Sequence, residues 1–122
     1  MPQVLLDKKS FIVNSFEQAK EAVKLNEGRE LSIISAPGSA LYYGPSYFIS
    51  LKHELEKNYN SLKVKMWVDC GKNAGLAMKT IRQGGKHIIF TEPNNYQIHE
   101  MATQENVEII YSIPDIIDLS KN

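Results

Sequence analysis

The sequence predicts an α/β domain of three layers, with helices on the faces of a mostly parallel sheet of about five strands. Two observations predict this fold class: short apolar runs typical of strands recur along the chain, and amphipathic helical patterns separate them. Strands that alternate with helices need crossover connections, which make neighbouring strands parallel. Right-handed crossovers favour a flavodoxin-like or Rossmann-like sheet, or half of a (βα) barrel. The strand order is not readable from the sequence.

Length and composition indicate one domain over residues 1–122, with residues 1–10 as an N-terminal extension. The apolar fraction of 43% and the charged fraction of 23% are those of an ordinary globular protein. Fourteen basic and fourteen acidic residues cancel. We therefore expect no nucleic acid or anionic membrane as a partner. The single cysteine, Cys70, excludes an internal disulfide framework and a multi-cysteine zinc site.

The N-terminus contains neither a basic region nor a long apolar run, so it does not resemble a signal peptide. The apolar runs, such as Ile88–Phe90, are far too short to span a membrane. A single free cysteine also fits a reducing compartment. We therefore expect a cytoplasmic protein.

The first third of the chain predicts two strands around a helix. Phe11–Val13 is a short apolar run typical of a strand. Ser15 and Gln18 have the spacing of a capping box, which begins a helix, and Gly28 suits the left-handed residue that ends it. Leu31–Ser35 then predicts the second strand.

A long loop separates the second strand from the second helix, because proline and glycine in Ala36–Ser39 interrupt both kinds of element. The helix is expected to begin at Gly44–Pro45, since proline is tolerated in the first turn. Its core-facing residues recur at helical spacing: Phe48, Leu51, Leu55 and Tyr59.

The second half of the chain repeats this pattern. Val64–Val68 and His87–Phe90 predict the third and fourth strands, and Asn73 is a suitable N-cap for the helix between them. Asn94 and Gln97 resemble a second capping box. The last two predicted elements are a fifth strand at Val107–Tyr111 and a short helix or turn at Ile113–Leu119 that docks on the sheet.

Ligands of open α/β sheets bind at the carboxyl ends of the strands. In this sequence the rule selects three loops, which are rich in glycine, asparagine and charged residues. They are Ser35–Gly44, Asp69–Asn73 and Thr91–Asn95.

Cys70 lies between a strand and a helix N-terminus, with Lys72 nearby. The helix dipole and the lysine would both favour the thiolate, which predicts a nucleophilic or redox-sensitive cysteine. Asp69 or Glu92 would then transfer protons. The alternative, which we favour, is a half-buried cysteine beside a tight turn, with Asp69 capping backbone N–H groups. Glu92, at the end of the fourth strand, is also a candidate ligand-binding residue, and the alternative is a solvated loop glutamate.

The same stretch also resembles an anion cradle. Gly71 permits close backbone approach, Lys72 supplies charge, and the N–H groups at Asn73 and beyond point outward. Ordinary helix capping is the alternative interpretation. The segment is neither a Walker A loop nor a dinucleotide-binding fingerprint, so we predict no cofactor.

The loop before Pro45 is longer than most strand-to-helix connections, and long loops in compact domains are often functional. Ser39, Tyr42 and Tyr43 would supply hydroxyl groups and an aromatic wall to a pocket. Equally, the tyrosines would fold back onto the core. The histidines match no metal-binding motif, so we assign no metal.

Two motifs, Ser35–Gly38 (S-A-P-G) and Asp69–Gly71 (D-C-G) followed by Ala74–Gly75, resemble a family of short uncharacterised bacterial α/β proteins. The resemblance extends over most of the chain, from about Phe11 to Leu119. It implies that the two loops lie together in space, and it implies no activity.

Three functions stay open from the sequence. The first is a domain that binds a small ligand or an anion in a pocket formed by the loops around these residues: Ser39, Tyr43, Asp69, Cys70 and Lys72. The second is an enzyme with Cys70 as its nucleophile. The third is a non-catalytic module that self-associates or binds a partner protein, indicated by the apolar residues Val4–Leu6 and by Trp67.

Overall fold

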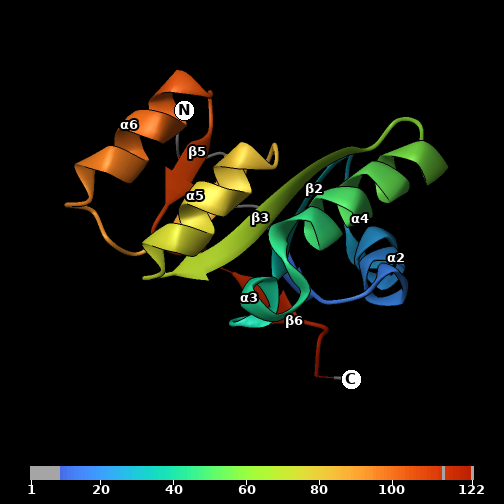
Figure 1. The fold of residues 1–122 in the computed structure, drawn as a ribbon. Coiled ribbons are helices and arrows are strands. Elements are labelled where there is room, and N and C mark those ends of the chain that lie inside the picture. The colour runs from blue at the N-terminus through green and yellow to red at the C-terminus, as the bar shows by residue number, and fades with distance from the viewer. Residues whose placement is uncertain (1–8, 114, 122) are drawn as a thin grey trace.

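The computed structural model describes residues 9–113 and 115–121. From β1 to β5, helices separate successive strands, as the sequence predicts (Figure 1). In chain order the elements are β1 (Ser10–Val13), α2 (Phe16–Leu25), β2 (Glu30–Ser35), α3 (Ser39–Tyr43), α4 (Pro45–Asn58), β3 (Lys63–Gly71), α5 (Ala74–Arg82), β4 (His87–Phe90), α6 (Tyr96–Gln104), β5 (Glu108–Ile110) and β6 (Ile116–Asp118).

The described strands form one six-stranded sheet in the order β5-β4-β3-β2-β1-β6, and every pair is parallel. The predicted α/β class and parallel sheet are confirmed, with six strands rather than five. From β1 to β5, each strand lies beside the next one in the sequence, as in half of a (βα) barrel. This part of the sheet therefore contains no reversal of strand order, the feature that creates the ligand crevice of Rossmann-like sheets.

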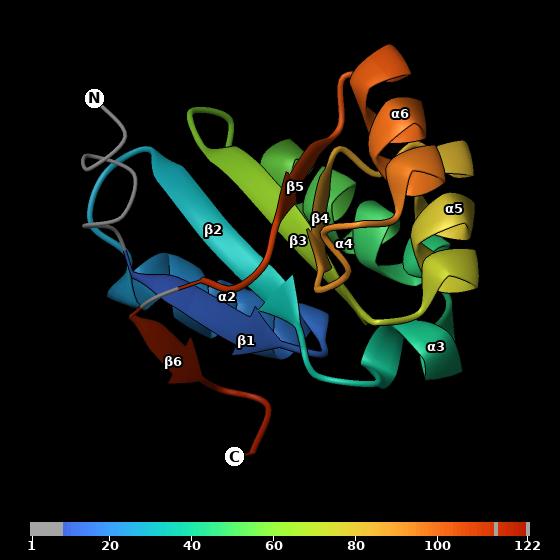
Figure 2. The same ribbon diagram turned by 90° about the vertical axis from the view of Figure 1, so that its left-hand side faces the viewer.

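The main core lies between the sheet and the helices, which cover one face of it (Figures 1 and 2). When successive strands are added in one direction by right-handed crossovers, the connecting helices all lie on the same side. Phe11, Ile33 and Val68 of the sheet pack here against Phe48 and Leu55 of α4. The predicted core-facing stripe of this helix is thereby confirmed, with Tyr59 partly buried at its end.

The third layer is the connection from β5 to β6, which crosses the other face of the sheet (Figure 2). A second apolar cluster lies on this face, formed by Ile34, Trp67 and Ile89 with Ile113 of the connection packed against it. Trp67 is buried, so it supplies no exposed surface for a partner. The other apolar feature of the interaction hypothesis, Val4–Leu6, lies outside the described residues.

The predicted terminal helix or turn at Ile113–Leu119 is wrong, because part of this segment is strand β6. β6 pairs with β1, with Ser10 opposite Ile116. The backbone N–H of Leu119 donates to the carbonyl of Ile12 at 2.9 Å. The outer edge of β1 offers unpaired backbone groups, and the β-branched isoleucines suit a strand, so pairing prevails over a local turn.

Two further boundaries differ from the sequence predictions. β3 continues to Gly71 instead of ending at Val68, because a bulge between Asp69 and Gly71 lets pairing with β4 continue. The N-cap of α6 is Asn95 rather than Asn94. The side chain of Asn95 accepts a hydrogen bond from the N–H of Ile98 at 3.2 Å. Among the described helices, none is long and apolar enough to cross a membrane.

Candidate functional site

The three loops selected from the sequence lie at the same edge of the sheet, because they follow neighbouring parallel strands. The backbone N–H of Asp69 donates to the hydroxyl of Ser35 at 2.9 Å, which joins the ends of β2 and β3. The N–H of Thr91 donates to the carbonyl of Gly71 at 2.9 Å, which joins β3 to the loop after β4. The loops are therefore fixed beside one another.

Cys70 lies within β3 and its side chain is buried in the main core, with an exposed fraction of 4%. Its Sγ lies 3.6 Å from the hydroxyl of Thr80 on α5. The pKa of the thiol is raised from its ordinary value of 9.0 to about 11. Burial is the largest cause, the hydrogen bond with Thr80 opposes the increase, and the charge of Asp69 adds to it. This geometry favours the core interpretation of Cys70 over the nucleophile.

Asp69 is half-buried beside the bulge of β3. Burial raises the pKa of its carboxyl group, although a hydrogen bond from the N–H of Gly71 at 3.0 Å opposes the increase. This bond matches the predicted role of Asp69 in capping backbone N–H groups. Cys70 and Asp69 are consecutive strand residues, so their side chains leave opposite faces of the sheet.

Asn73 caps α5 as predicted, since its side chain accepts a hydrogen bond from the N–H of Leu76 at 2.9 Å. Gly71 has a φ of +53°, which brings the chain from the strand into the turn before the helix. Lys72 is exposed and forms no ion pair with a described residue. The anion cradle at these residues stays a prediction.

Glu92 is exposed in the turn before α6. Its backbone carbonyl lies 3.2 Å from Nε2 of His99, and its carboxylate is on the surface. The described residues contain no group of three or more histidine, cysteine, aspartate or glutamate side chains placed to hold a metal ion.

The loop after β2 contains the short helix α3, which exposes its tyrosines instead of folding them all back onto the core. Tyr42 is 83% exposed and Tyr43 is 49% exposed, whereas Ser39 is half-buried at the start of the helix. The ring of Tyr43 stacks on that of Tyr47 in α4, with centroids 4.9 Å apart and planes 22° from parallel. The aromatic wall expected from Tyr42 and Tyr43 therefore has a third member.

Tyr47 is held from two sides. Its hydroxyl donates to the backbone carbonyl of Asn14 at 2.6 Å, so it bridges α4 and the turn after β1. Its ring packs edge-on against the buried ring of Phe48, with centroids 4.9 Å apart. The stacked pair of tyrosines is thus a rigid surface feature.

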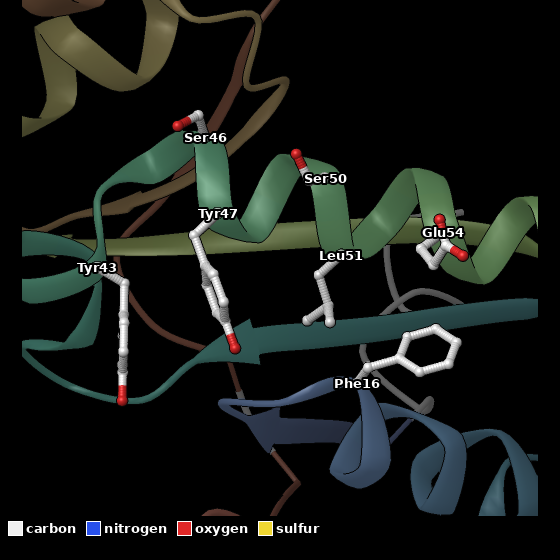
Figure 3. Close-up of a pocket in the computed structure, with 7 residues that line it drawn as sticks. All are labelled: Phe16, Tyr43, Ser46, Tyr47, Ser50, Leu51 and Glu54. Carbon is white, nitrogen blue, oxygen red and sulfur yellow. The ribbon is translucent and has the colours of Figure 1, made fainter.

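These tyrosines border an open groove of about 450 Å³ between α4 and the start of α2 (Figure 3). Two parallel rows of side chains lie along α4 (Figure 3). The first row is apolar and contains Tyr47 and Leu51, and Tyr43 of α3 extends it beyond the start of α4. The second row is polar. Phe16 of α2 lies across the groove (Figure 3). The polar row consists of Ser46, Ser50 and Glu54.

Of the residues that line the groove, only Tyr43 was a candidate from the sequence. A signal for Tyr47 was present: it is a large aromatic residue just outside the apolar stripe of α4, four positions after Tyr43. The opposite wall, Phe16, is 27 positions earlier than Tyr43 in the sequence, and only the fold reveals that the two lie near one another.

Two further pockets are lined by described residues. One, of about 280 Å³, lies beside Tyr59 at the far end of α4. The other, of about 220 Å³, lies at the amino ends of the strands beside His53 and His87. Burial lowers the pKa of His87, which favours its neutral imidazole. The candidate residues from the sequence line neither of these two pockets.

Comparison with known proteins gives no match to a family model, to a curated protein or to a solved structure. The resemblance to short bacterial α/β proteins therefore stays a prediction, and the function has to be argued from the geometry.

Proposed function

We propose that this protein is a non-catalytic binding domain that recognises an extended segment of a partner protein on the groove between α2 and α4. The observation that supports it most strongly is the exposed, rigid stack of Tyr43 and Tyr47 at the end of that groove. Tyrosines are enriched at protein interfaces, because they bury a large apolar area at a low cost in conformational entropy.

The shape of the groove favours a peptide segment over a metabolite. Small-molecule sites enclose most of the surface of their ligand, whereas this groove is open along its length. An extended chain that lies along α4 would contact the apolar row and the polar row together. The buried thiol of Cys70 supports a binding role more than catalysis.

Peptide display on the immobilised domain tests this proposal. We expect a random peptide library to yield clones that bind the wild-type domain and lose at least tenfold in binding to the Tyr43→Ala variant. Tyr96→Ala is the matched control, because Tyr96 is an exposed tyrosine on α6, 79% exposed against 49% for Tyr43, and lies away from the groove. Clones that bind both variants equally, or no clones at all, would contradict the proposal.

A second candidate function is anion binding at the start of α5. The observation in its favour is that an exposed lysine without a described ion-pair partner, Lys72, directly precedes a capped helix N-terminus. The residues proposed for it are Gly71, Lys72 and Asn73. A titration with inorganic phosphate, followed by the amide resonances of Lys72 and Ala74, tests this function. No change up to tens of millimolar phosphate would exclude it.

A further inference from the structure

The chemistry of the groove narrows the kind of segment that fits it. The stacked rings of Tyr43 and Tyr47 present aromatic edges and faces, and Leu51, which is only 6% exposed, adds a small apolar area to the floor of the groove (Figure 3). Rigid aromatic ridges of this kind suit proline rings, because proline is already restricted and loses little conformational entropy on binding.

A proline-rich segment adopts the polyproline II helix, whose backbone makes no internal hydrogen bonds. Its carbonyl groups therefore need donors from the partner. The hydroxyl groups of Ser46 and Ser50 lie along the α4 edge of the groove, and with the hydroxyl group of Tyr43 they are donors available to these carbonyls. An α-helical ligand would satisfy its carbonyls with its own N–H groups and would not need this row of hydroxyl groups.

Among the residues that the structure describes, Glu54 is the one charged side chain that lines the groove, and it is acidic. The carboxylate of Glu54 ends the polar row and forms no ion pair with a described residue. Its neighbour Asn58 donates a long hydrogen bond of 3.4 Å to it. On the α2 wall, Lys20 lies over the ring of Phe16 but is paired with Glu17 at 2.9 Å. Among the described residues, the groove thus presents one negative charge without an ion-pair partner, which a cationic side chain of the ligand would neutralise.

The spacing along α4 sets the position of that cation. Tyr47 and Glu54 are seven residues apart on one helix, a rise of roughly 10 Å at 1.5 Å per residue. One turn of polyproline II covers three residues and about 9 Å. A proline beside Tyr47 therefore places the residue three positions along the ligand next to Glu54.

We propose that the occupant of the groove is a proline-rich segment of a partner protein, in the polyproline II conformation, with an arginine or lysine three residues from the proline that contacts Tyr43 and Tyr47. This inference rests on the proposed function and names its ligand class. The charge complementarity at Glu54 is what distinguishes this occupant from an uncharged apolar segment or a second copy of the chain.

Fluorescence anisotropy with three short labelled peptides tests the inference. The first is polyproline with one arginine, the second is the same peptide with glutamate in place of arginine, and the third is a glycine–serine chain with the arginine. We expect the first to bind at least tenfold more tightly than the other two. Tyr43→Ala should weaken its binding at least tenfold, whereas Tyr96→Ala should not.

A charge swap at Glu54 tests the position of the cation. Glu54→Lys should reverse the preference, so that the glutamate peptide binds more tightly than the arginine peptide, while Glu100→Lys on α6 should leave the preference unchanged. Glu54 and Glu100 are both exposed, so neither variant is expected to unfold the protein. An unchanged preference in Glu54→Lys would overturn the inference.

The peptide-display experiment distinguishes a failure of the polyproline inference from a failure of the proposed binding function. If display yields peptides that depend on Tyr43 but contain neither proline nor a basic residue, the groove binds a partner and the polyproline inference is wrong. If no peptide of any composition depends on Tyr43, both are wrong. Dimerisation that Tyr43→Ala abolishes, measured by sedimentation, would instead make the occupant a second copy of the chain.

Discussion

At the scale of single residues, the environment of Cys70 decides its chemistry. The sequence places it before a helix N-terminus, which would lower the pKa of the thiol. In the structure β3 continues through Cys70, so its side chain enters the core beside Thr80, and burial raises the pKa to about 11. Whether the pKa of Cys70 is lowered or raised could not be predicted from the sequence, because the answer depends on whether the strand ends before or after this residue.

We therefore expect slow alkylation of Cys70 by iodoacetamide in the folded protein at pH 7 to 8, and rapid alkylation after denaturation. The folded pKa lies above the ordinary value of 9.0, so the buried neutral thiol has its full stabilising effect below pH 9. That effect is lost as the pH rises from 9 towards 11. Thiol-specific mass spectrometry against pH measures the rate. Fast alkylation of the folded chain at neutral pH would restore the nucleophile hypothesis.

At the scale of elements, the ends of helices and strands were less predictable than their existence. Ser15 and Asn73 act as N-caps as the sequence predicts, whereas α6 begins one residue later than expected. Asn94 and Asn95 are both suitable caps, and only the path of the loop selects between them.

This choice is testable with two neighbouring substitutions. Asn95→Ala should cost about 1 kcal/mol of unfolding free energy, because the N–H of Ile98 loses its acceptor. Asn94→Ala, at the exposed neighbouring position, should change the unfolding free energy by less than about 0.5 kcal/mol. Urea denaturation measures both, and a larger cost for Asn94→Ala would place the cap where the sequence suggested.

Strand β6 is the strand that the sequence missed, as it also missed the short helix α3, and the burial pattern of β6 gives a second test. Ile117 packs against the main core, whereas Ile116 is 45% exposed. Ile117→Ala should therefore lower the unfolding free energy by about 2 kcal/mol, and Ile116→Ala by less than half of that. Equal and small effects in urea denaturation would mean that β6 does not dock beside β1.

At the scale of the whole molecule, alternation of strands and helices was sufficient to predict an α/β domain with a parallel sheet. It was insufficient for the strand order, since that order depends on which strands pack together. The consequence for function is direct: the groove between α2 and α4 joins residues as distant as Phe16 and Glu54, so no sequence pattern could reveal it. The carboxyl-edge loops, by contrast, lie together as predicted.

The most direct test of the account maps where a ligand binds. Amide resonances of the full chain would be followed by heteronuclear NMR during titration with the arginine-containing polyproline peptide. We predict that the resonances of Tyr43, Tyr47 and Ser50 shift in proportion to occupancy, while those of α6 stay unchanged. Shifts confined to Lys72 and Asn73 at the start of α5, or no shifts at all, would contradict the claim that the tyrosine groove is the binding site.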